Sequence, residues 1–305
     1  MHRFIYFILI ITALASCRLE TETEDRGPLH IVTTTGIIED GVEHIVQDSA
    51  EVTSIMGPGT DPHIYKPTPS DIELMDDADV IIANGLHLEG KMSDMLKQYG
   101  EEKPVIFVSD GLAKKDLIKS ADFEDSFDPH IWFDWKLWME GMLHVTQELS
   151  EIDTNCRDYF GKNYDIYKAK LTVMDMDVKN VLNSIPEEKR VLITSHDAFS
   201  YFGRRYNVEV RGIQGISTLS EVGLKDISDM VDFVIEKEIR SIFVETSTSD
   251  KTAQSIVDGC KDKGYELKLD GPLYSDALGE PDSEGGSYVG MILANAKTIA
   301  EGLKQ

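Results

Sequence analysis

The chain has 305 residues, of which 41% are hydrophobic and 28% are charged. This composition supplies enough apolar material for a packed core and excludes an intrinsically disordered chain. At about 100–200 residues per domain, the length favours two compact units. The 30 Lys and Arg residues against 55 Asp and Glu residues give a formal net charge of −25. Because such a charge repels phosphate groups, nucleic acid is not an expected partner.

The N-terminal segment predicts export. Its apolar run FIYFILIITAL (4–14) is shorter than the roughly 20 residues that span a bilayer, and it has the length of a signal-peptide core. The sequence LASC (14–17) follows and resembles a bacterial lipobox. We therefore expect a lipoprotein signal peptide over 1–17, lipidation at Cys17 and a polar tether over 18–27, which place the protein outside the cytoplasm on a bacterial membrane. The alternatives are an ordinary cleaved signal and an N-terminal anchor.

Two further cysteines, Cys156 and Cys260, would remain after lipidation. A disulfide between them is compatible with an oxidising compartment, but sequence alone does not fix the required geometry, so their pairing stays open. The chain contains no Cys-x-x-Cys motif, and neither a thiolate zinc site nor a thioredoxin-like motif is predicted.

Strand and helix signals alternate in both halves of the chain. In the first half, strands are expected at 30–37, 51–56, 79–85 and 104–111, and helices after 37, from Pro69, at 88–100 and at 134–149. In the second half, strands are expected at 190–195, 208–213, 240–246 and 265–269, and helices at 198–206, 224–238, 251–264 and 288–303.

Between the two halves, apolar side chains recur at steps of three and four within 155–185, which predicts one helix of about 30 residues. The expected fold is α/β, with two α/β lobes joined by one long rigid helix. The expected limits are 28–152 for the N-terminal lobe, 153–185 for the connecting helix and 186–305 for the C-terminal lobe. Ligands should bind in the cleft between the lobes, where strand ends meet.

Three of the eight histidines lie in short motifs near predicted strand ends: His63 and His130, each in Asp-Pro-His, and His196 in Ser-His-Asp. Their wide spacing excludes a local zinc finger but suits loops of different βα units that converge on one cleft. Asp276 offers a fourth, oxygen donor. Three imidazoles and a carboxylate suit a first-row divalent cation. The alternative from spacing alone is a set of polar loop residues without a ligand.

Several longer motifs in the sequence resemble those of one known protein family. In chain order they are DGVEHIVQD, GPGTDPHIYKPTPSD, NGLHLEG, DPHIW, TSHDAFSYFGRRY, GISTLSEVGLKDI, IFVETSTSDK and LYSDALG…EGGSYVGMI. Together they resemble the cluster A-I metal-binding lipoproteins that feed ABC importers, over nearly the whole mature chain.

The resemblance implies two α/β lobes joined by a single rigid helix, with a metal ion held between them and passed to a membrane permease. It implies metal ligands at His63, His130, His196 and Asp276. For Glu245, in IFVET, it implies an acceptor for an imidazole N–H, a common companion of metal-bound histidine; an exposed strand-end carboxylate is the alternative.

The remaining histidines are expected to be structural or superficial. His87 lies beside the NGLHLEG motif but is not expected to be a ligand, and His30, His44 and His144 are expected to have structural or surface roles. The three tryptophans, Trp132, Trp135 and Trp138, are expected to pack in the core.

The sequence leaves the metal open between Mn²⁺ and Zn²⁺. The stretch before His130 is acidic but lacks the His-rich loop of many zinc importers. Manganese-specialised members usually carry Glu at the third position, which here is His196, and a softer His₃Asp set leans toward zinc. Yet GISTLSEVGL and EGGSYVGMI most resemble the subgroup associated with both metals.

The favoured function is that of a monomeric, non-enzymatic binding protein. It would capture Mn²⁺ or Zn²⁺ and deliver the ion to the permease and ATPase subunits of an ABC importer. The alternatives are a metal-dependent hydrolase that uses the same three histidines, and an adhesin-like surface lipoprotein.

Overall fold

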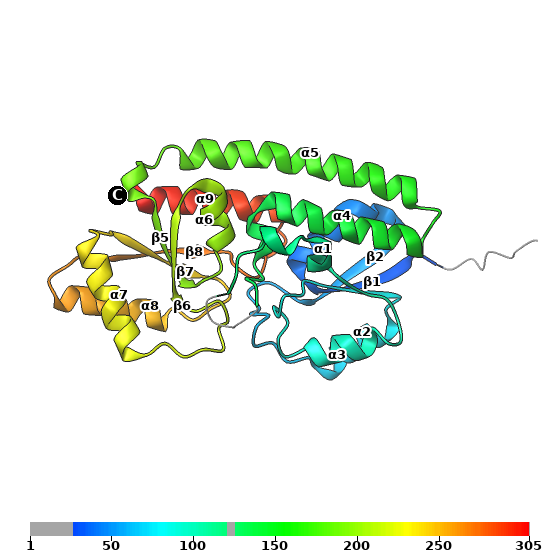
Figure 1. Ribbon diagram of the computed structural model, residues 1–305, viewed down its shortest axis with the longest axis horizontal. Coiled ribbons are helices and arrows are strands. Elements are labelled where there is room, and N and C mark those ends of the chain that lie inside the picture. The colour runs from blue at the N-terminus through cyan, green and yellow to red at the C-terminus, as the bar shows by residue number, and fades with distance from the viewer. Residues whose placement is uncertain (1–26, 121–125, 305) are drawn as a thin grey trace, which may run out of the picture.

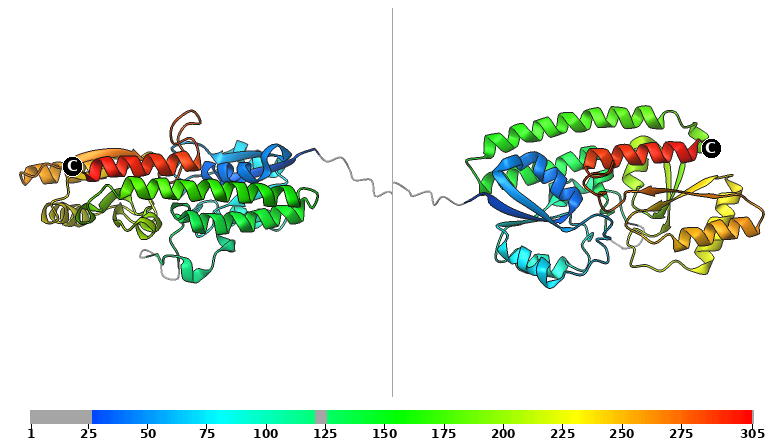
Figure 2. Two further views of the ribbon diagram at one scale, coloured as in Figure 1. Left: turned by 90° about the horizontal axis from the view of Figure 1, so that it is seen from above. Right: turned by 180° about the vertical axis from the view of Figure 1, so that it is seen from behind.

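The computed structural model describes residues 27–120 and 126–304. The predicted signal peptide, including Cys17, lies outside the described residues. Two α/β lobes lie side by side, and the long helix α5 (Arg157–Leu182) runs along both of them, as Figures 1 and 2 show. The predicted fold class is therefore confirmed.

The N-terminal lobe contains a four-stranded parallel sheet in the order β2-β1-β3-β4. Thr35 ends β1 and caps the first helix, because its hydroxyl accepts a hydrogen bond from the Ile38 N–H. Thr68 and Asp71 form a capping box that starts the second helix at Pro69. The elements are β1 (Leu29–Thr35), α1 (Gly36–Val46), β2 (Ala50–Met56), α2 (Pro69–Asp77), β3 (Val80–Ala83), α3 (Ser93–Tyr99), β4 (Val105–Phe107) and α4 (Trp135–Ile152).

The C-terminal lobe repeats this topology with the parallel order β6-β5-β7-β8. Its elements are β5 (Val191–His196), α6 (Ser200–Tyr206), β6 (Glu209–Gln214), α7 (Leu224–Glu236), β7 (Ser241–Glu245), α8 (Lys251–Asp262), β8 (Lys268–Leu273) and α9 (Tyr288–Leu303). Short 3-10 turns lie at Gln47–Ser49, Val108–Gly111, Lys114–Asp116, Ile131–Phe133 and Glu187–Lys189.

Helix α5 packs on α1 and α4 of the N-terminal lobe and on α9 of the C-terminal lobe. Its buried apolar side chains recur at steps of three and four, as the sequence predicts: Phe160, Tyr164, Tyr167, Leu171, Met174, Val178 and Leu182. Tyr159, which shares the predicted pattern, is exposed instead. One continuous helix thus contributes its buried face to both lobes.

Several predicted elements have different limits. The strand predicted at 104–111 ends at Phe107, and a 3-10 turn over Val108–Gly111 follows it. A helix is predicted from Leu88, but α3 begins at Ser93, and turns occupy 86–92, in which Leu86 and His87 have left-handed φ angles of 53° and 66°. The Glu89 carboxylate accepts hydrogen bonds from the backbone N–H of Asn84 and stabilises this turn. The last strand is predicted at 265–269, whereas β8 begins at Lys268 and pairs with β7 as far as Leu273.

The base of the interlobe cleft is closed by buried hydrogen bonds. The Tyr201 hydroxyl donates to the Asp128 carbonyl (2.9 Å), and the Trp132 indole N–H donates to the Ser275 carbonyl (3.0 Å). All three tryptophans are buried, as predicted. These contacts join the segment around Trp132 to the C-terminal lobe.

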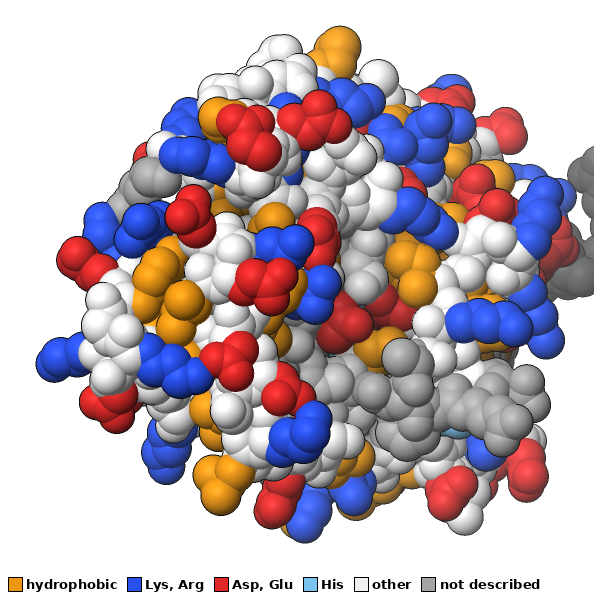
Figure 3. All heavy atoms as spheres, turned by 60° about the vertical axis from the view of Figure 1, so that its left-hand side comes forward, with side chains coloured by type: hydrophobic (Ala, Val, Ile, Leu, Met, Phe, Trp, Pro, Cys, Tyr) orange, Lys and Arg blue, Asp and Glu red, His pale blue; other side chains and the backbone are white. Residues whose placement is uncertain are grey.

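The two described cysteines are free, so the possible disulfide between Cys156 and Cys260 is not formed. Cys260 lies in the core of the C-terminal lobe, whereas Cys156 packs at the edge of the core cluster that α5 shares. Among the described residues, no helix combines the length and apolarity needed to cross a bilayer. Figure 3 shows Lys and Arg side chains interspersed with Asp and Glu on one face of the molecule.

Candidate metal centre

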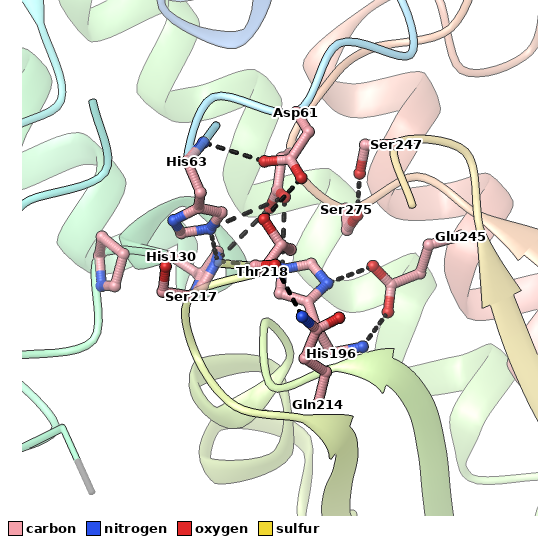
Figure 4. Close-up of polar contacts among 12 residues, drawn as sticks. Asp61, His63, His130, His196, Gln214, Ser217, Thr218, Glu245, Ser247 and Ser275 are labelled. Atoms are coloured by element: carbon pink, nitrogen blue, oxygen red, sulfur yellow. Dashed lines mark hydrogen bonds and ion pairs between the residues drawn. The ribbon is translucent and has the colours of Figure 1, made fainter. Parts of the chain in front are cut away.

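The fold brings the four predicted residues together between the lobes. His63 lies in the loop between β2 and α2, and His130 lies just before α4. His196 ends β5, and Asp276 lies in the loop between β8 and α9. Because carboxyl ends of parallel strands meet at one edge of a sheet, loops from both sheets can converge here, as Figure 4 shows for the histidines.

The ligand-type atoms of these residues form a tight cluster, all within 4.8 Å of one another. The Nε2 atom of His130 lies 3.3 Å from Nε2 of His63 and 3.4 Å from Nε2 of His196. The Asp276 carboxylate lies 3.4 Å from Nε2 of His130, 3.3 Å from Nε2 of His196 and 3.9 Å from Nε2 of His63. All three Nε2 atoms therefore face one point that the carboxylate shares.

The cluster is buried, and its carboxylate lacks ordinary partners. His63 is 2% exposed, His130 and His196 are fully buried, and Asp276 is 1% exposed. Apart from the three imidazoles, no described group contacts either Asp276 carboxylate oxygen as a hydrogen-bond donor. A buried carboxylate without such bonds is costly unless a cation compensates it. Three nitrogen donors and one oxygen donor suit a tetrahedral first-row cation.

Two of the imidazoles are oriented by carboxylates on their far side. Nδ1 of His130 lies 2.7 Å from Oδ1 of Asp128, and Nδ1 of His196 lies 2.5 Å from Oε2 of Glu245. When these rings are neutral, as a metal requires, the carboxylate keeps the remaining proton on Nδ1 and leaves the Nε2 lone pair directed into the cluster. Glu245 thus lies where it can accept the imidazole N–H of His196, which is the role that the family resemblance implies.

The two Asp-Pro-His motifs share one local structure but differ in what the aspartate reaches. In both, the aspartate accepts a hydrogen bond at 2.9 Å from the backbone N–H of the histidine two residues later. Asp128 also contacts the ring of His130, whereas Asp61 accepts a hydrogen bond from Thr218 of the other lobe (2.6 Å). The sequence analysis assigns no role to either aspartate, although the Asp-Pro-His tripeptide occurs at both histidines and could have indicated one.

Electrostatics divide the histidines into one neutral and two cationic residues. Burial, reinforced by the neighbouring imidazoles, lowers the pKa of His63 to about 3 despite the nearby Asp276. Burial also opposes charge on His130 and His196, but carboxylates outweigh it. Asp128 and Asp276 raise the pKa of His130 to about 9, and Glu245 and Asp276 raise the pKa of His196 well above its usual value.

The Asp276 carboxylate is the counterpart of these two cations. Burial disfavours its charge, but the two histidinium ions hold its pKa well below the usual range. Without metal, two imidazolium protons thus balance the buried carboxylate. A divalent ion that displaces both protons leaves the charge of the cluster unchanged, and the cluster is therefore suited to exchange a 2+ ion for two protons.

The other described histidines lie outside this cluster. His87 is exposed in a left-handed turn. His44 stacks on Tyr167 with a centroid distance of 4.4 Å, and His144 lies 3.9 Å from Glu148 on the same helix. His30 uses its backbone N–H to bind Asp79 at the start of β1. These positions agree with the structural and surface roles expected for them.

Comparison with known proteins places the chain among metal-binding proteins. It is 42% identical over 293 residues to the manganese-binding lipoprotein MntA of Bacillus subtilis, covering 96% of this chain and 95% of that protein. It is 37% identical over 279 residues to the zinc-binding protein TroA of Treponema pallidum, covering 92% and 90%.

The fold agrees with these similarities. The solved structure of the periplasmic zinc-binding protein TroA from Treponema pallidum matches with a TM-score of 0.88 and 36% identity, covering 92% of this chain and all of that one. The sequence profile of zinc-uptake complex component A, periplasmic (ZnuA), matches residues 31–302. The chain therefore belongs to the ZnuA family of metal-binding proteins.

Proposed function

We propose that this protein captures Mn²⁺ or Zn²⁺ outside the cytoplasm and delivers the ion to an ABC importer, with His63, His130, His196 and Asp276 as ligands. The observation that carries this proposal is the convergence of the Asp276 carboxylate and three imidazole Nε2 atoms within 4.8 Å of one another in a buried cluster. A transported divalent cation can take the place of the two imidazolium protons as the partner of this carboxylate.

The donor set favours binding over catalysis. A catalytic zinc ion normally has three protein ligands and a free position for water, whereas here four side chains from four separate segments enclose one point. Relatives are named as metal-binding lipoproteins and substrate-binding lipoproteins of ABC transporters. We therefore infer that the protein is not an enzyme and that the metal-dependent hydrolase is the weaker hypothesis.

The transported ion can be Mn²⁺ or Zn²⁺, because one relative is named for manganese binding and another for zinc binding. Zinc outranks manganese at most nitrogen-rich sites, so tighter zinc binding does not identify the cargo. The informative quantity is the dissociation constant for Mn²⁺. Submicromolar binding would support a manganese-capable importer, and millimolar binding would support a zinc carrier.

The test is calorimetry on the full chain in detergent, stripped of metal and titrated with each ion, with elemental analysis of the bound metal. One ion per chain is expected. If neither metal binds stoichiometrically, the four-residue site is wrong. Uptake of labelled Mn²⁺ and Zn²⁺ by cells that lack the protein then tests transport, since loss of uptake is expected only for the physiological cargo.

We also propose that Cys17 carries the lipid anchor and that the mature protein acts as a monomer beside its permease and ATPase. Several relatives are named lipoproteins, which supports an anchored protein outside the cytoplasm. Labelling cells with a palmitate analogue tests the anchor: wild type should be labelled and a Cys17→Ser variant should not. A labelled Cys17→Ser variant would place the lipid elsewhere.

A further inference from the structure

The two lobes also meet beside the metal cluster, through one hydrogen bond. Thr218, in the loop between β6 and α7, donates from its hydroxyl to Oδ2 of Asp61 at 2.6 Å. The other oxygen of Asp61 accepts the backbone N–H of His63 at 2.9 Å. A single carboxylate thus connects a ligand of one lobe to a loop of the other, as Figure 4 shows.

The loop that carries Thr218 is braced from its own lobe. Gln214, the last residue of β6, donates from its side-chain amide to the Thr218 carbonyl (2.7 Å) and to the Ser220 carbonyl. The hydroxyl of Thr218 is therefore presented to Asp61 by a loop anchored on the sheet. The contact therefore joins a braced loop of the C-terminal lobe to the loop that carries His63.

His63 differs from the other imidazoles in how it is held. Carboxylates contact the Nδ1 atoms of His130 and His196, whereas Asp61 binds the backbone of His63. The position of His63 therefore depends on its loop. A cavity of about 230 Å³ adjoins this loop, and among the four clustered residues His63 alone lines it, together with Ser217 from the Thr218 loop. His63 is therefore the clustered residue that borders this cavity.

The opposite side of the cleft is closed far more firmly. There the buried bonds from Tyr201 to Asp128 and from Trp132 to Ser275 join the lobes, inside the hydrophobic core. Asp61 and Thr218 are only half-buried, so breaking their bond leaves groups that water can reach and costs less than breaking the buried bonds on the opposite side. If the cleft opens locally, the Asp61 side is where opening is easiest.

We propose that Asp61 and Thr218 form the closing contact of the metal cleft and set the rate at which the ion leaves. The inference rests on the proposed function, since it concerns release of the ion that the cluster binds. Asp61 is a positioning residue here: it acts through His63 and through the loop of the other lobe, without contacting the ion.

The test measures the dissociation rate of Zn²⁺ from the full chain in detergent by mixing the loaded protein with excess fluorescent chelator. Thr218→Val removes the hydroxyl with little change in shape and should speed release about tenfold or more. Thr218→Ser restores a hydroxyl and should return the rate to near that of wild type. This rescue separates a specific hydrogen bond from general loss of packing.

A matched control lies within one lobe. The Ser54 hydroxyl donates to Glu39 at 2.7 Å, and Glu39 also accepts the Ser54 backbone N–H, so the same bond type is present away from the cleft. Ser54→Ala should leave the release rate unchanged. Asp61→Ala removes the partner of the same hydrogen bond in the other lobe and should speed Zn²⁺ release as Thr218→Val does. The double variant Asp61→Ala/Thr218→Val should release Zn²⁺ no faster than either single variant.

The outcomes are distinct. If wild-type protein binds neither Zn²⁺ nor Mn²⁺, the proposed function fails, and this inference fails with it; if it binds Mn²⁺ alone, the release rate is measured with Mn²⁺. If wild type binds one ion but folded Thr218→Val and Asp61→Ala release it within twofold of the wild-type rate, only the closing contact is wrong. Equal acceleration by Ser54→Ala, or no rescue by Thr218→Ser, would likewise overturn it. Circular dichroism identifies any variant that fails to fold. If Thr218→Val does not fold, the release rate of Asp61→Ala tests the contact, and if Asp61→Ala does not fold, that of Thr218→Val tests it.

Discussion

The Glu245 carboxylate binds His196 twice: one oxygen accepts the backbone N–H at 2.9 Å, and the other lies 2.5 Å from ring Nδ1. Both groups are buried. Each N–H of His196 therefore has an oxygen of its own, and the ring is held with Nε2 toward Asp276 (3.3 Å). Backbone and ring are thus positioned by one side chain from the neighbouring strand.

Glu245→Gln should weaken metal binding by about 10–100-fold. A glutamine offers one acceptor where two N–H groups need one each, and its NH₂ group opposes the ring in its required tautomer. Calorimetry with Zn²⁺ measures the loss, and the exposed Glu209→Gln is the matched control, expected to bind like wild type. Unchanged affinity in Glu245→Gln would show that the ring needs no orienting carboxylate.

His63→Ala or His130→Ala should each weaken metal binding about 10²–10³-fold, because four ligands share a binding free energy of about 10–16 kcal/mol. His87→Ala should bind like wild type, since His87 is exposed outside the cluster. Competition with a chelator of known affinity measures these constants. Equal losses in His63→Ala and His87→Ala would refute the ligand assignment.

Metal binding should release about two protons per ion at pH 7, because His130 and His196 have raised pKa values and must lose their Nε2 protons to ligate. His63, with its pKa lowered to about 3, is already neutral and contributes none. Affinity should therefore fall as pH falls and should still be rising as pH approaches the His130 pKa of about 9. Calorimetry in buffers of different ionisation enthalpy counts the protons, and a count near zero would contradict the prediction.

Trp132→Phe should reduce both stability and metal affinity. The indole N–H of Trp132 donates to the carbonyl of Ser275, the residue before Asp276, and its loss leaves a buried carbonyl unpaired at a cost of about 1–3 kcal/mol. Trp138→Phe is the control, because Trp138 donates to the Tyr167 hydroxyl away from the cluster. Chemical denaturation should show a loss in both variants, and weaker Zn²⁺ binding only in Trp132→Phe. Equal metal affinity in the two variants would refute the positioning role.

Removal of the metal should leave the arrangement of the lobes nearly unchanged. Helix α5 packs on α1 and α4 of one lobe and on α9 of the other, and a buried seam runs along its length. A large hinge motion would break that packing, so only local loop opening is expected. Small-angle scattering curves of metal-free and loaded protein should superimpose. A clear decrease in the radius of gyration on loading would contradict this rigidity.

Much of the architecture follows from local sequence patterns. Alternating apolar runs and amphipathic segments predict both α/β lobes, and the spacing of residues such as Tyr167 and Leu171 predicts the helix between them. These predictions hold because strand and helix periodicity depend on near neighbours. The turn at Leu86 and His87 could not be predicted in this way, since Glu89, whose carboxylate holds the turn, fits the helical pattern predicted for 88–100.

The sequence by itself determined which side chains could bind a metal, since His63, His130, His196 and Asp276 stand in motifs that mark them. Only the tertiary structure decided that their donor atoms meet within 4.8 Å, that His87 stays outside, and that Cys156 and Cys260 do not pair. It also decided the contact of Asp61 with Thr218, 157 positions apart in the chain. The reason is physical: spacing fixes which face of an element a residue occupies, whereas distances across a cleft depend on how two sheets and the helix joining them pack.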